Sequence, residues 1–250
     1  MNIVVAIKQV PDLQQIRIRN REPVLDGVPQ TLGMIDKNAL EAGLQLKEAF
    51  GGQLIVVMAG NEEVSETVKE ALAVGADEAY IVADNAINQI DGAQSALIIA
   101  ELIKKIPEVG LLLCGEGSGD NYSGQVGSRV AELLGWPQVG YASHMEINGE
   151  ELKVLRSLEE VEEWVSMPLP GVVSVLSDIN EPRLPSVTQV LKAGKKPKRV
   201  YTIEELGLSI DNQVVVTKSN LAPENKRRQQ ALKTIDELMQ VLRSAGLLRG

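Results

Sequence analysis

The sequence predicts an α/β protein built on a doubly wound, mostly parallel β-sheet. Two observations support this fold class. Short apolar runs alternate with segments of helical periodicity through the first 140 residues, and these runs are continuous, as in strands buried on both faces. We expect the strands at residues 3–7, 54–58, 79–82 and 111–114. Because helices connect them, right-handed crossovers should make them parallel.

Three helices are predicted between these strands. The first has small and apolar residues at helical spacing and stops at two glycines (Ala39, Gly43, Leu46 and Phe50, then Gly51 and Gly52). The second begins at Asn61, whose side chain can cap it, and ends at Gly75. The third spans residues 92–105 and is closed by Pro107.

After residue 137 the pattern changes to short segments that we expect to be antiparallel strands completing the sheet. They cover residues 145–147, 152–156, 160–165 and 172–176, and Asn148-Gly149 predicts a hairpin between the first two. Regularity is then lost between residues 180 and 199, where prolines interrupt a polar, increasingly basic stretch.

These patterns divide the chain into three expected parts. They are an α/β domain over residues 1–179, a loop and linker over 180–200, and an extended C-terminal arm over 201–250. The arm contains a helical stripe of apolar residues with little core of its own to cover (Leu232, Ile235, Leu238, Met239 and Leu242). This stripe predicts a helix that packs on another chain.

Composition excludes several classes of protein. The 250 residues carry 25 Lys plus Arg against 34 Asp plus Glu, a net charge of −9, which argues against nucleic-acid binding. The longest apolar stretches are far shorter than the roughly 20 residues that span a bilayer, so no membrane insertion is expected. The N-terminus lacks a basic leader and a cleavage site, and the single cysteine cannot form an internal disulfide. We expect a cytoplasmic protein.

Few side chains could carry acid–base or nucleophilic chemistry. His144 is the single histidine, and it has no cysteine, histidine or paired carboxylate nearby in the sequence. The apolar neighbours of Cys114 indicate a buried thiol rather than a reactive one. The sequence therefore predicts neither a catalytic residue nor a metal site.

The most informative segment is a strand, a glycine-rich loop and a helix over residues 111–134. Glycines let backbone N–H groups approach an anion, and a helix start adds its positive dipole end, so a phosphate could lie there. Ser123 can cap the helix. The loop is neither the G-x-G-x-x-G fingerprint nor a P-loop, and its glycines fit a tight turn equally well. In a parallel sheet, the loops at residues 6–8 and 58–61 should face the same crevice.

The chain resembles the electron transfer flavoprotein beta family along nearly its whole length. Four stretches carry the resemblance, namely residues 5–12 (VAIKQVPD), 38–48 (NALEAGLQLKE), 114–127 (ending GQVG) and 156–173. Residues 177–186 and 191–197 are similar to the subgroup associated with nitrogen fixation, carnitine metabolism and flavin-based electron bifurcation.

The resemblance implies an adenine-nucleotide-hydrolase-like fold and a heterodimer. The alpha subunit would hold the redox FAD, and the beta subunit would bury AMP or, in bifurcating members, a second FAD. Including Lys8 and Gly60 from the strand ends, the expected cofactor-binding residues are Ala6, Lys8, Gly33, Met34, Ile35, Asp36, Ala59, Gly60, Gly115, Glu116, Gly117, Ser118, Gly119, Asp120, Asn121, Tyr122, Ser123, Gly124, Gln125 and Val126. On position alone, Lys8 is either a solvated charge or a cation facing phosphate.

The proline-flanked segment matches the family's recognition loop, which implies contact with a partner dehydrogenase through Pro185, Val187, Val190 and Leu191, with Val187 where a leucine is usual. Glu116 stands where many members carry Lys or Arg, Gly124 replaces a common Asn, and Leu13 replaces a tyrosine of some carriers. The first two departures favour a second FAD over AMP. A bifurcating member would oxidise NADH and reduce ferredoxin or flavodoxin, and would also reduce a quinone oxidoreductase or acyl-CoA dehydrogenase.

Two alternatives belong to other classes. A non-redox ATP- or AMP-binding module of the universal-stress type would share the α/β architecture but has no use for a recognition loop or an exposed C-terminal stripe. An adenylating enzyme would need a basic pyrophosphate loop, which residues 115–127 lack.

Overall fold

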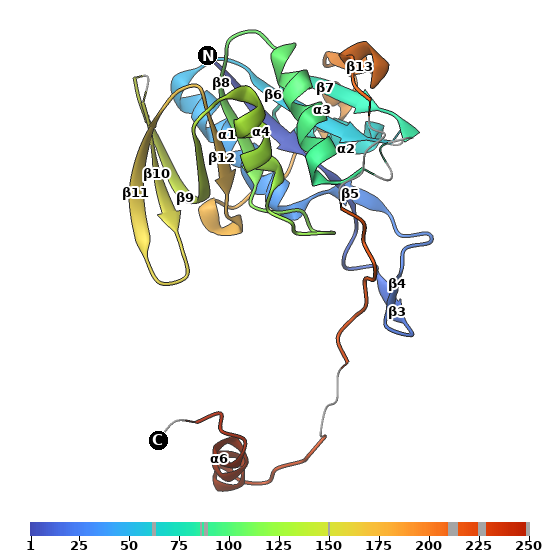
Figure 1. The fold of residues 1–250 in the computed structure, drawn as a ribbon, viewed down its shortest axis with the longest axis vertical. Helices are drawn as coiled ribbons and strands as arrows, with labels where there is room; N and C mark the ends of the chain where they lie inside the picture. The colour runs from blue at the N-terminus through green and yellow to red at the C-terminus, as the bar shows by residue number, and fades with distance from the viewer. Residues whose placement is uncertain are drawn as a thin grey trace. The chain divides into compact units, whose positions relative to one another are not determined.

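A mixed β-sheet forms the centre of the larger of two structural units. The computed structural model describes residues 1–61, 64–85, 87, 90–149, 151–209, 215–224 and 229–248. Unit 1 contains residues 1–17 and 24–218, and unit 2 contains residues 18–23 and 219–250. The expected α/β fold class is confirmed by unit 1 (Figure 1).

Nine strands of the described residues form this sheet, in the order β11-β10-β9-β12-β8-β1-β6-β7-β13. All neighbours from β9 to β13 pair in parallel, whereas β9, β10 and β11 pair antiparallel. The bounds are β1 Asn2–Ile7, β6 Leu54–Gly60, β7 Glu78–Ala83, β8 Val109–Gly115, β9 Gln138–Asn148, β10 Glu151–Ser157, β11 Glu162–Pro168, β12 Gly171–Val175 and β13 Lys198–Tyr201.

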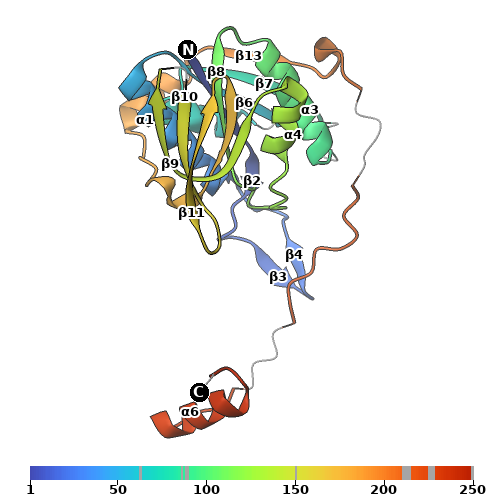
Figure 2. The same cartoon turned by 60° about the vertical axis from the view of Figure 1, so that its left-hand side comes forward.

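Helices cover both faces of the sheet (Figures 1 and 2). One apolar core lies between the sheet and α1 (Met34–Phe50) and α2 (Ser65–Val74). The other lies under α3 (Gly92–Lys104) and α4 (Val126–Leu134). Alternate residues of β1 face the two cores, since Ile3 and Val5 belong to the first and Val4 to the second. The continuous apolar runs of the sequence therefore reflect burial on both sides.

Short elements precede α1 and follow β12. Strands β2 (Gln9–Pro11) and β5 (Gln30–Leu32) pair antiparallel, and β3 (Arg17–Arg19) and β4 (Glu22–Val24) form a second small sheet. Two 3-10 turns, η2 (Ser177–Ile179) and η3 (Glu204–Leu206), connect later parts of the chain.

The expected direction of the strand at residues 172–176 was wrong. It forms β12, which is parallel to β8 on one side and to β9 on the other, so it is a central strand rather than part of the antiparallel extension. Its apolar pattern is the same for either direction, and the chain returns across the sheet after β11 to insert it. The hairpin between β9 and β10 is confirmed, with Asn148 paired to Glu151.

The irregular linker expected over residues 180–199 contains two regular elements. Helix α5 (Val187–Ala193) begins at Ser186, which forms a capping box with Gln189, and β13 adds an edge strand beside β7. The basic run is not a solvated linker throughout, because the Lys196 ammonium donates to the carbonyls of Leu72 and Ala76 at 2.8 and 2.6 Å. These carbonyls close the end of α2.

Two predicted caps were also wrong. Helix α4 begins after Gln125 rather than at Ser123, and α2 begins after Val64 rather than at Asn61. Neither helix has a side-chain cap hydrogen bond at its start. Helix α3 has the strong start instead, because Asp91 accepts the N–H groups of Ala93 and Gln94 in a capping box.

Unit 2 contains α6 (Ile235–Ser244), the helix predicted from the C-terminal stripe. Thr234 caps it through the Glu237 N–H, and Leu232 lies before its first turn. Ile235, Leu238 and Met239 are exposed within the described residues. The smaller unit also joins Arg21 to the Ala222 carbonyl at 2.8 Å. The division of the chain at residues 179 and 200 stays a prediction.

Candidate functional site

The sheet has its topological switch point between β1 and β8. After β1 the chain leads to α1 on one face, and after β8 it leads to α4 on the other, while the two strands are parallel neighbours. Ligands of open α/β sheets bind in the crevice outside the carboxyl ends of such strands. Here these ends are Ile7 of β1 and Gly115 of β8, with Gly60 of β6 on the same edge.

Asp36, in the first turn of α1, joins both strand ends. Its Oδ2 accepts the Lys8 N–H at 2.7 Å, and its carboxylate also accepts the Gly115 N–H. The residue is 7% exposed. Burial raises its pKa from 3.8 to about 7, against the lowering effect of these hydrogen bonds and of the Lys8 charge. Asp36 therefore ties three elements together with a carboxyl group that titrates near neutral pH.

Glycine is needed where the chain packs against Asp36. A Cβ on Gly33 would lie 2.8 Å from Asp36 Oδ2, and one on Gly115 would lie 3.0 Å from Asp36 Oδ1. Larger residues at either position would displace the carboxylate.

Lys8 and Asp120 form an ion pair across the edge of the sheet. Lys8 Nζ lies 2.6 Å from Asp120 Oδ2, and the two side chains are 44% and 28% exposed. Burial acts to raise the pKa of Asp120, but hydrogen bonds from Lys8 and Ser118 and the Lys8 charge outweigh it, so the pKa is lowered. Asp120 is thus an ionised partner of the lysine.

The glycine-rich loop between β8 and α4 has an ordered local structure. The Glu116 N–H donates to the Val175 carbonyl at 3.0 Å, and the Tyr122 N–H donates to the Ser118 carbonyl at 2.9 Å. The Tyr122 ring covers Gly117, where a Cβ would lie 3.0 Å from the ring. A hydrogen bond to Glu116 raises the pKa of the Tyr122 phenol. Gly124 has a φ of +63°, which a residue with a side chain adopts only with strain.

The other predicted cofactor residues lie at the same sheet edge or on the loop. Ala6, Ala59 and Gly60 come from the last residues of β1 and β6, and Met34 and Ile35 from the first turn of α1. Met34 is 66% exposed, whereas Ile35 packs where a Cβ on Gly115 would be. The remaining loop residues are exposed before α4 (Gly119, Asn121, Ser123 and Gln125), and Val126 is its first residue.

Cys114 is buried, as its apolar neighbours predicted, and His144 is on the surface. Burial, and then the neighbouring Asp36, raise the pKa of the Cys114 thiol to about 12, so it is not a thiolate at neutral pH. His144 is exposed on β9, with its ring edge against Trp164.

The predicted partner-recognition residues lie on or beside α5. Val187 and Leu191 are 77% and 74% exposed, and Val190 is 38% exposed. Sequence reasoning missed Leu184, which is 90% exposed and precedes Pro185. These apolar side chains form a surface that we call the α5 patch (Leu184, Val187, Val190 and Leu191).

Arg183 anchors the segment that leads into this patch, and the sequence did not reveal it. Its guanidinium binds Glu41 in a two-contact arrangement at 2.8 and 2.9 Å and Glu48 at 2.7 and 3.1 Å. The Glu41 side chain is only 4% exposed. Asn38 adds hydrogen bonds to the carbonyls of Ser177 and Asn180 at 2.7 and 2.8 Å. Helix α1 therefore fixes where the segment leaves the core.

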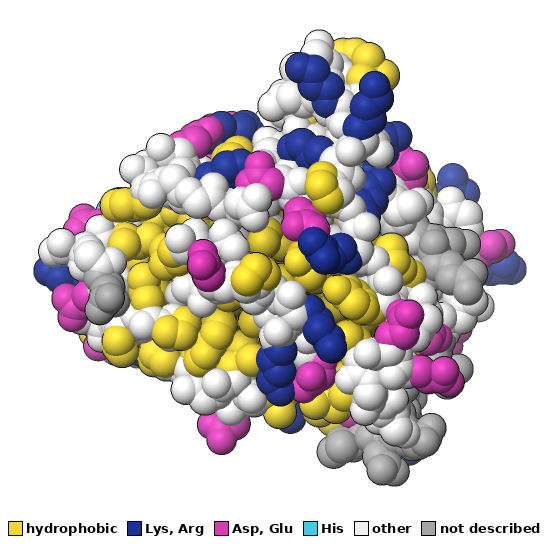
Figure 3. Space-filling view, turned by 90° about the horizontal axis from the view of Figure 1, so that it is seen from above, with side chains coloured by type: hydrophobic (Ala, Val, Ile, Leu, Met, Phe, Trp, Pro, Cys, Tyr) yellow, Lys and Arg dark blue, Asp and Glu magenta, His cyan; other side chains and the backbone are white. Residues whose placement is uncertain are grey.

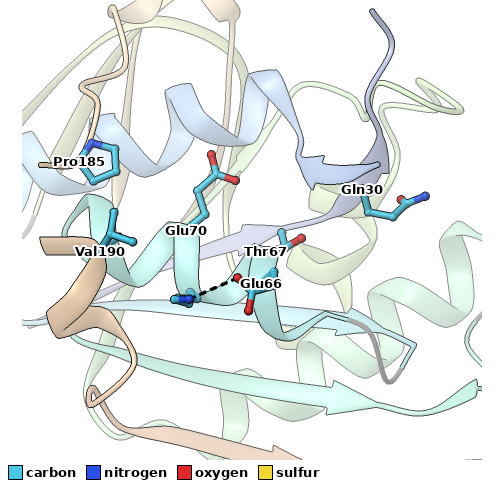
Figure 4. A pocket seen from close by; sticks show the side chains of 8 residues that line it. Gln30, Glu66, Thr67, Glu70, Pro185 and Val190 are labelled. Carbon is cyan, nitrogen blue, oxygen red and sulfur yellow. Dashed lines mark hydrogen bonds and ion pairs between the residues drawn. The ribbon is translucent and has the colours of Figure 1, made fainter. Parts of the chain in front are cut away.

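A small open pocket is lined by residues of α2 and of the segment that contains α5 (Figure 4). It encloses about 290 Å³ between Pro185 and Val190 on one side and Glu66, Thr67, Glu70 and Ala73 of α2 on the other. Its charges are paired, because Lys69 lies 3.4 Å from Glu66 and Lys37 lies 2.7 Å from Glu70.

Surface charge is mixed rather than of one sign. Figure 3 shows Lys and Arg side chains interspersed with Asp and Glu on one face, with hydrophobic side chains between them. Among the residues that the structure describes, no group of three or more His, Cys, Asp or Glu side chains could hold a metal ion. Over the same ranges, no helix is both long and apolar enough to cross a bilayer.

The fold and the residues at the strand ends define a doubly wound α/β protein with a glycine-rich loop at its switch point. Comparison with known sequences then identifies its family: a model described as "Electron transfer flavoprotein domain" matches residues 24–206. The chain belongs to the electron transfer flavoprotein family, with the beta subunits of that family as its relatives.

Three relatives illustrate the similarity. The electron transfer flavoprotein subunit beta of Thermoanaerobacterium thermosaccharolyticum is 36% identical over 82% of this chain and 80% of its own length. The subunit of the same name from Clostridium acetobutylicum is 35% identical over 85% of this chain and 82% of its own. The caffeyl-CoA reductase-Etf complex subunit CarD of Acetobacterium woodii is 35% identical over 84% and 81%.

Family membership establishes the coarse role. The chain is an electron transfer flavoprotein subunit of the beta type, and this role implies an alpha-subunit partner and a dehydrogenase-type partner. The stress-module and adenylating-enzyme alternatives are left without support.

Proposed function

We propose that this beta subunit holds an adenine nucleotide at the edge of the sheet where β1, β6 and β8 end. The observation that carries the proposal is the meeting of the Lys8–Asp120 pair, Asp36 and the glycine-rich loop at the switch point. Switch-point crevices are the usual nucleotide sites of doubly wound sheets.

The loop residues fit a nucleotide phosphate. A Cβ on Gly119 would be in ordinary van der Waals contact with Leu13, and Gly124 has a positive φ, which favours glycine. Since neither residue has a side chain, the backbone is bare at both positions, where an anion would approach. The loop leads into the start of α4, where unpaired N–H groups and the helix dipole favour negative charge.

Each part of the site would have a separate task. Backbone N–H groups of the glycine-rich loop at residues 117–126, other than those of Asn121 and Tyr122, which already have partners, would bind phosphate. Lys8 would supply the positive charge, and Asp36 would hold the strand ends in place. A flavin bound here would supply the redox chemistry through its isoalloxazine ring. The chain's own residues would bind, orient and bury it.

We further propose that the nucleotide is a second FAD, with AMP as the alternative, and that the complex bifurcates electrons. It would take them from NADH and pass them to ferredoxin or flavodoxin and, through the alpha-subunit FAD, to a quinone oxidoreductase or acyl-CoA dehydrogenase. Glu116 in the loop and the similarity to a subunit of a caffeyl-CoA reductase-Etf complex support this assignment.

The α5 patch would contact the partner dehydrogenase, and the stripe of α6 would pack on the alpha subunit. Exposed apolar side chains on an anchored segment suit a transient contact. We propose a cytoplasmic complex, in line with the sequence.

The test is to purify the chain with its alpha subunit, denature the complex, and quantify released FAD and AMP. Two FAD and no AMP per complex supports the bifurcating assignment. One FAD and one AMP supports a simple carrier and removes the second-FAD proposal. A complex that releases neither nucleotide beyond the alpha-subunit FAD would overturn the proposed site.

A further inference from the structure

The charges at the crevice do not suit an anionic ligand as they stand. Among the residues proposed to bind the nucleotide, three carry carboxyl groups, Asp36, Glu116 and Asp120, against one lysine, Lys8. The lysine is already engaged, since its ammonium lies 2.6 Å from Asp120. A nucleotide phosphate would add further negative charge, so its binding is favoured if one carboxyl group becomes neutral.

Asp36 is the carboxyl group placed to do this. Its hydrogen bonds come from the backbone N–H groups of Lys8 and Gly115, whereas Asp120 is paired with a cationic side chain. Asp120 is held ionised by Lys8 and Ser118, and Glu116 lies on the loop, where its side chain forms a hydrogen bond with the Tyr122 phenol. Asp36 is also the most buried of the three.

We propose that Asp36 is a positioning residue that takes up a proton when an adenine nucleotide binds, so that the crevice binds its nucleotide more tightly as the pH falls. The inference rests on the proposed nucleotide site and adds that a proton binds to Asp36 together with the nucleotide. In the protonated form Asp36 can still accept an N–H from a strand end, while it no longer repels the phosphate.

The groups around Asp36 determine the direction of the effect. Lys8 on the end of β1 lowers its pKa, Asp120 on the loop raises it, and Cys114 on β8 is a neutral thiol. With a free-state pKa of about 7, Asp36 is partly ionised at neutral pH. An added anion raises that pKa further, so protons are taken up on binding between about pH 7 and the higher bound value. Over this interval affinity falls by at most about tenfold per pH unit, the limit for one linked proton.

The experiment is calorimetric titration of the nucleotide-free complex with AMP and, separately, with FAD, near pH 7.5 in two buffers of different ionisation enthalpy. The difference in heat gives the number of protons taken up. The AMP phosphate has its own proton, with a pKa of about 6, but it contributes equally to every variant. Comparison with Asp36→Asn therefore isolates the carboxyl group.

We expect proton uptake in the wild type, and its loss in Asp36→Asn together with a flat pH profile of affinity. Because asparagine mimics the neutral state, Asp36→Asn should bind the nucleotide at pH 8 at least as tightly as the wild type, which a merely damaged site would not do. Equal proton uptake in both proteins, or weaker binding by Asp36→Asn at every pH, would overturn the inference. Wild-type protein that binds neither nucleotide would instead refute the proposed site.

Asp120→Asn keeps the inference testable should Asp36→Asn not fold. It removes a neighbouring negative charge and frees Lys8, so the pKa of Asp36 falls. The pH of greatest proton uptake should then move downward. A maximum that stays in place, or moves upward, would contradict the role of Asp36.

Discussion

Lys8 and Asp120 lie 112 positions apart in the sequence, yet their side chains form a 2.6 Å ion pair. The pair connects the end of β1 to the loop after β8, the two segments that meet at the switch point. Since both side chains are partly exposed, the pair contributes little to stability, about 0–1 kcal/mol. Its position at the crevice gives it more weight in ligand binding than in folding.

Lys8→Met should weaken nucleotide binding on the order of tenfold, the effect of one charge-assisted hydrogen bond. The free energy of unfolding should change by less than about 1 kcal/mol. Lys104→Met is a matched control, because Lys104 forms a 2.7 Å pair with Glu101 at similar exposure on α3. Nucleotide release and urea denaturation measure the two effects. An equal loss of nucleotide in both variants would exclude a specific role for Lys8.

Gly124→Asp should lower nucleotide occupancy more than Gly124→Asn. Both variants strain the positive φ, and both bring a Cβ within 3.1 Å of the Glu116 carbonyl oxygen, but only aspartate adds charge beside the phosphate. The difference between them, expected to be on the order of tenfold in affinity, therefore reports electrostatic repulsion. Identical occupancy in the two variants would show that no phosphate lies near this residue.

Arg183→Lys should destabilise unit 1 by about 1–3 kcal/mol, because lysine keeps the charge but cannot form the paired contacts to the largely buried Glu41. It should also raise the KM for the partner dehydrogenase, since the α5 patch loses its anchor on α1. Nucleotide occupancy should be unchanged. Denaturation curves and steady-state assays at several partner concentrations check both effects. An unchanged KM would show that the contact of Arg183 with α1 has no role in binding the partner.

Leu184→Ala and Leu191→Ala should change stability by no more than about 0.5 kcal/mol, because both side chains are exposed. If the α5 patch contacts the partner, each should raise the KM by several-fold with little effect on kcat. Val200→Ala, at a valine 59% exposed on β13, is the control and should behave as the wild type. Three indistinguishable variants would rule out the patch as the contact surface.

The buried Asp36 should make stability depend on pH even without a ligand. Its folded-state pKa of about 7 lies above the ordinary value of 3.8, so the folded protein holds a proton that the unfolded chain has lost. Stability from this group is full below pH 3.8, falls as the pH rises toward about 7, and is constant above. Asp36→Asn should remove that slope. Urea denaturation between pH 5 and 8 measures it, on a scale of about 1.4 kcal/mol per pKa unit. A slope that persists in the variant belongs to other groups.

The sequence predicted the parallel core correctly because burial on both faces leaves continuous apolar runs such as residues 54–58. It could not give the direction of β12, because Val172 and Val173 alternate between the two cores in either direction. Strand direction depends on the connection between neighbouring strands, and here the β10–β11 hairpin connects β9 to β12.

The candidate site was predictable in outline only. Strand ends and glycines are visible in the sequence, so Ala6, Gly60 and the loop after β8 could be named. The bonds of Asp36 to two distant N–H groups, and of Arg183 to Glu41 and Glu48, are tertiary contacts without a local pattern. The helix at residues 187–193 was missed because it has only seven residues and lies between prolines and a basic run, which predicted an irregular loop.

Strand β9 has a mechanical consequence. Its first half is bonded to β12 and its second half to β10, and Ala142 is a paired residue in both ladders, opposite Val175 and Arg156. Both ladders are irregular at this junction, because the register shifts between Val173 and Val175 in one and between Leu155 and Arg156 in the other. Such bulges bend a strand and interrupt its pairing locally. The β10–β11 hairpin therefore leaves the sheet at a bent root, and β12 alone separates that root from β8, at whose end the glycine-rich loop begins.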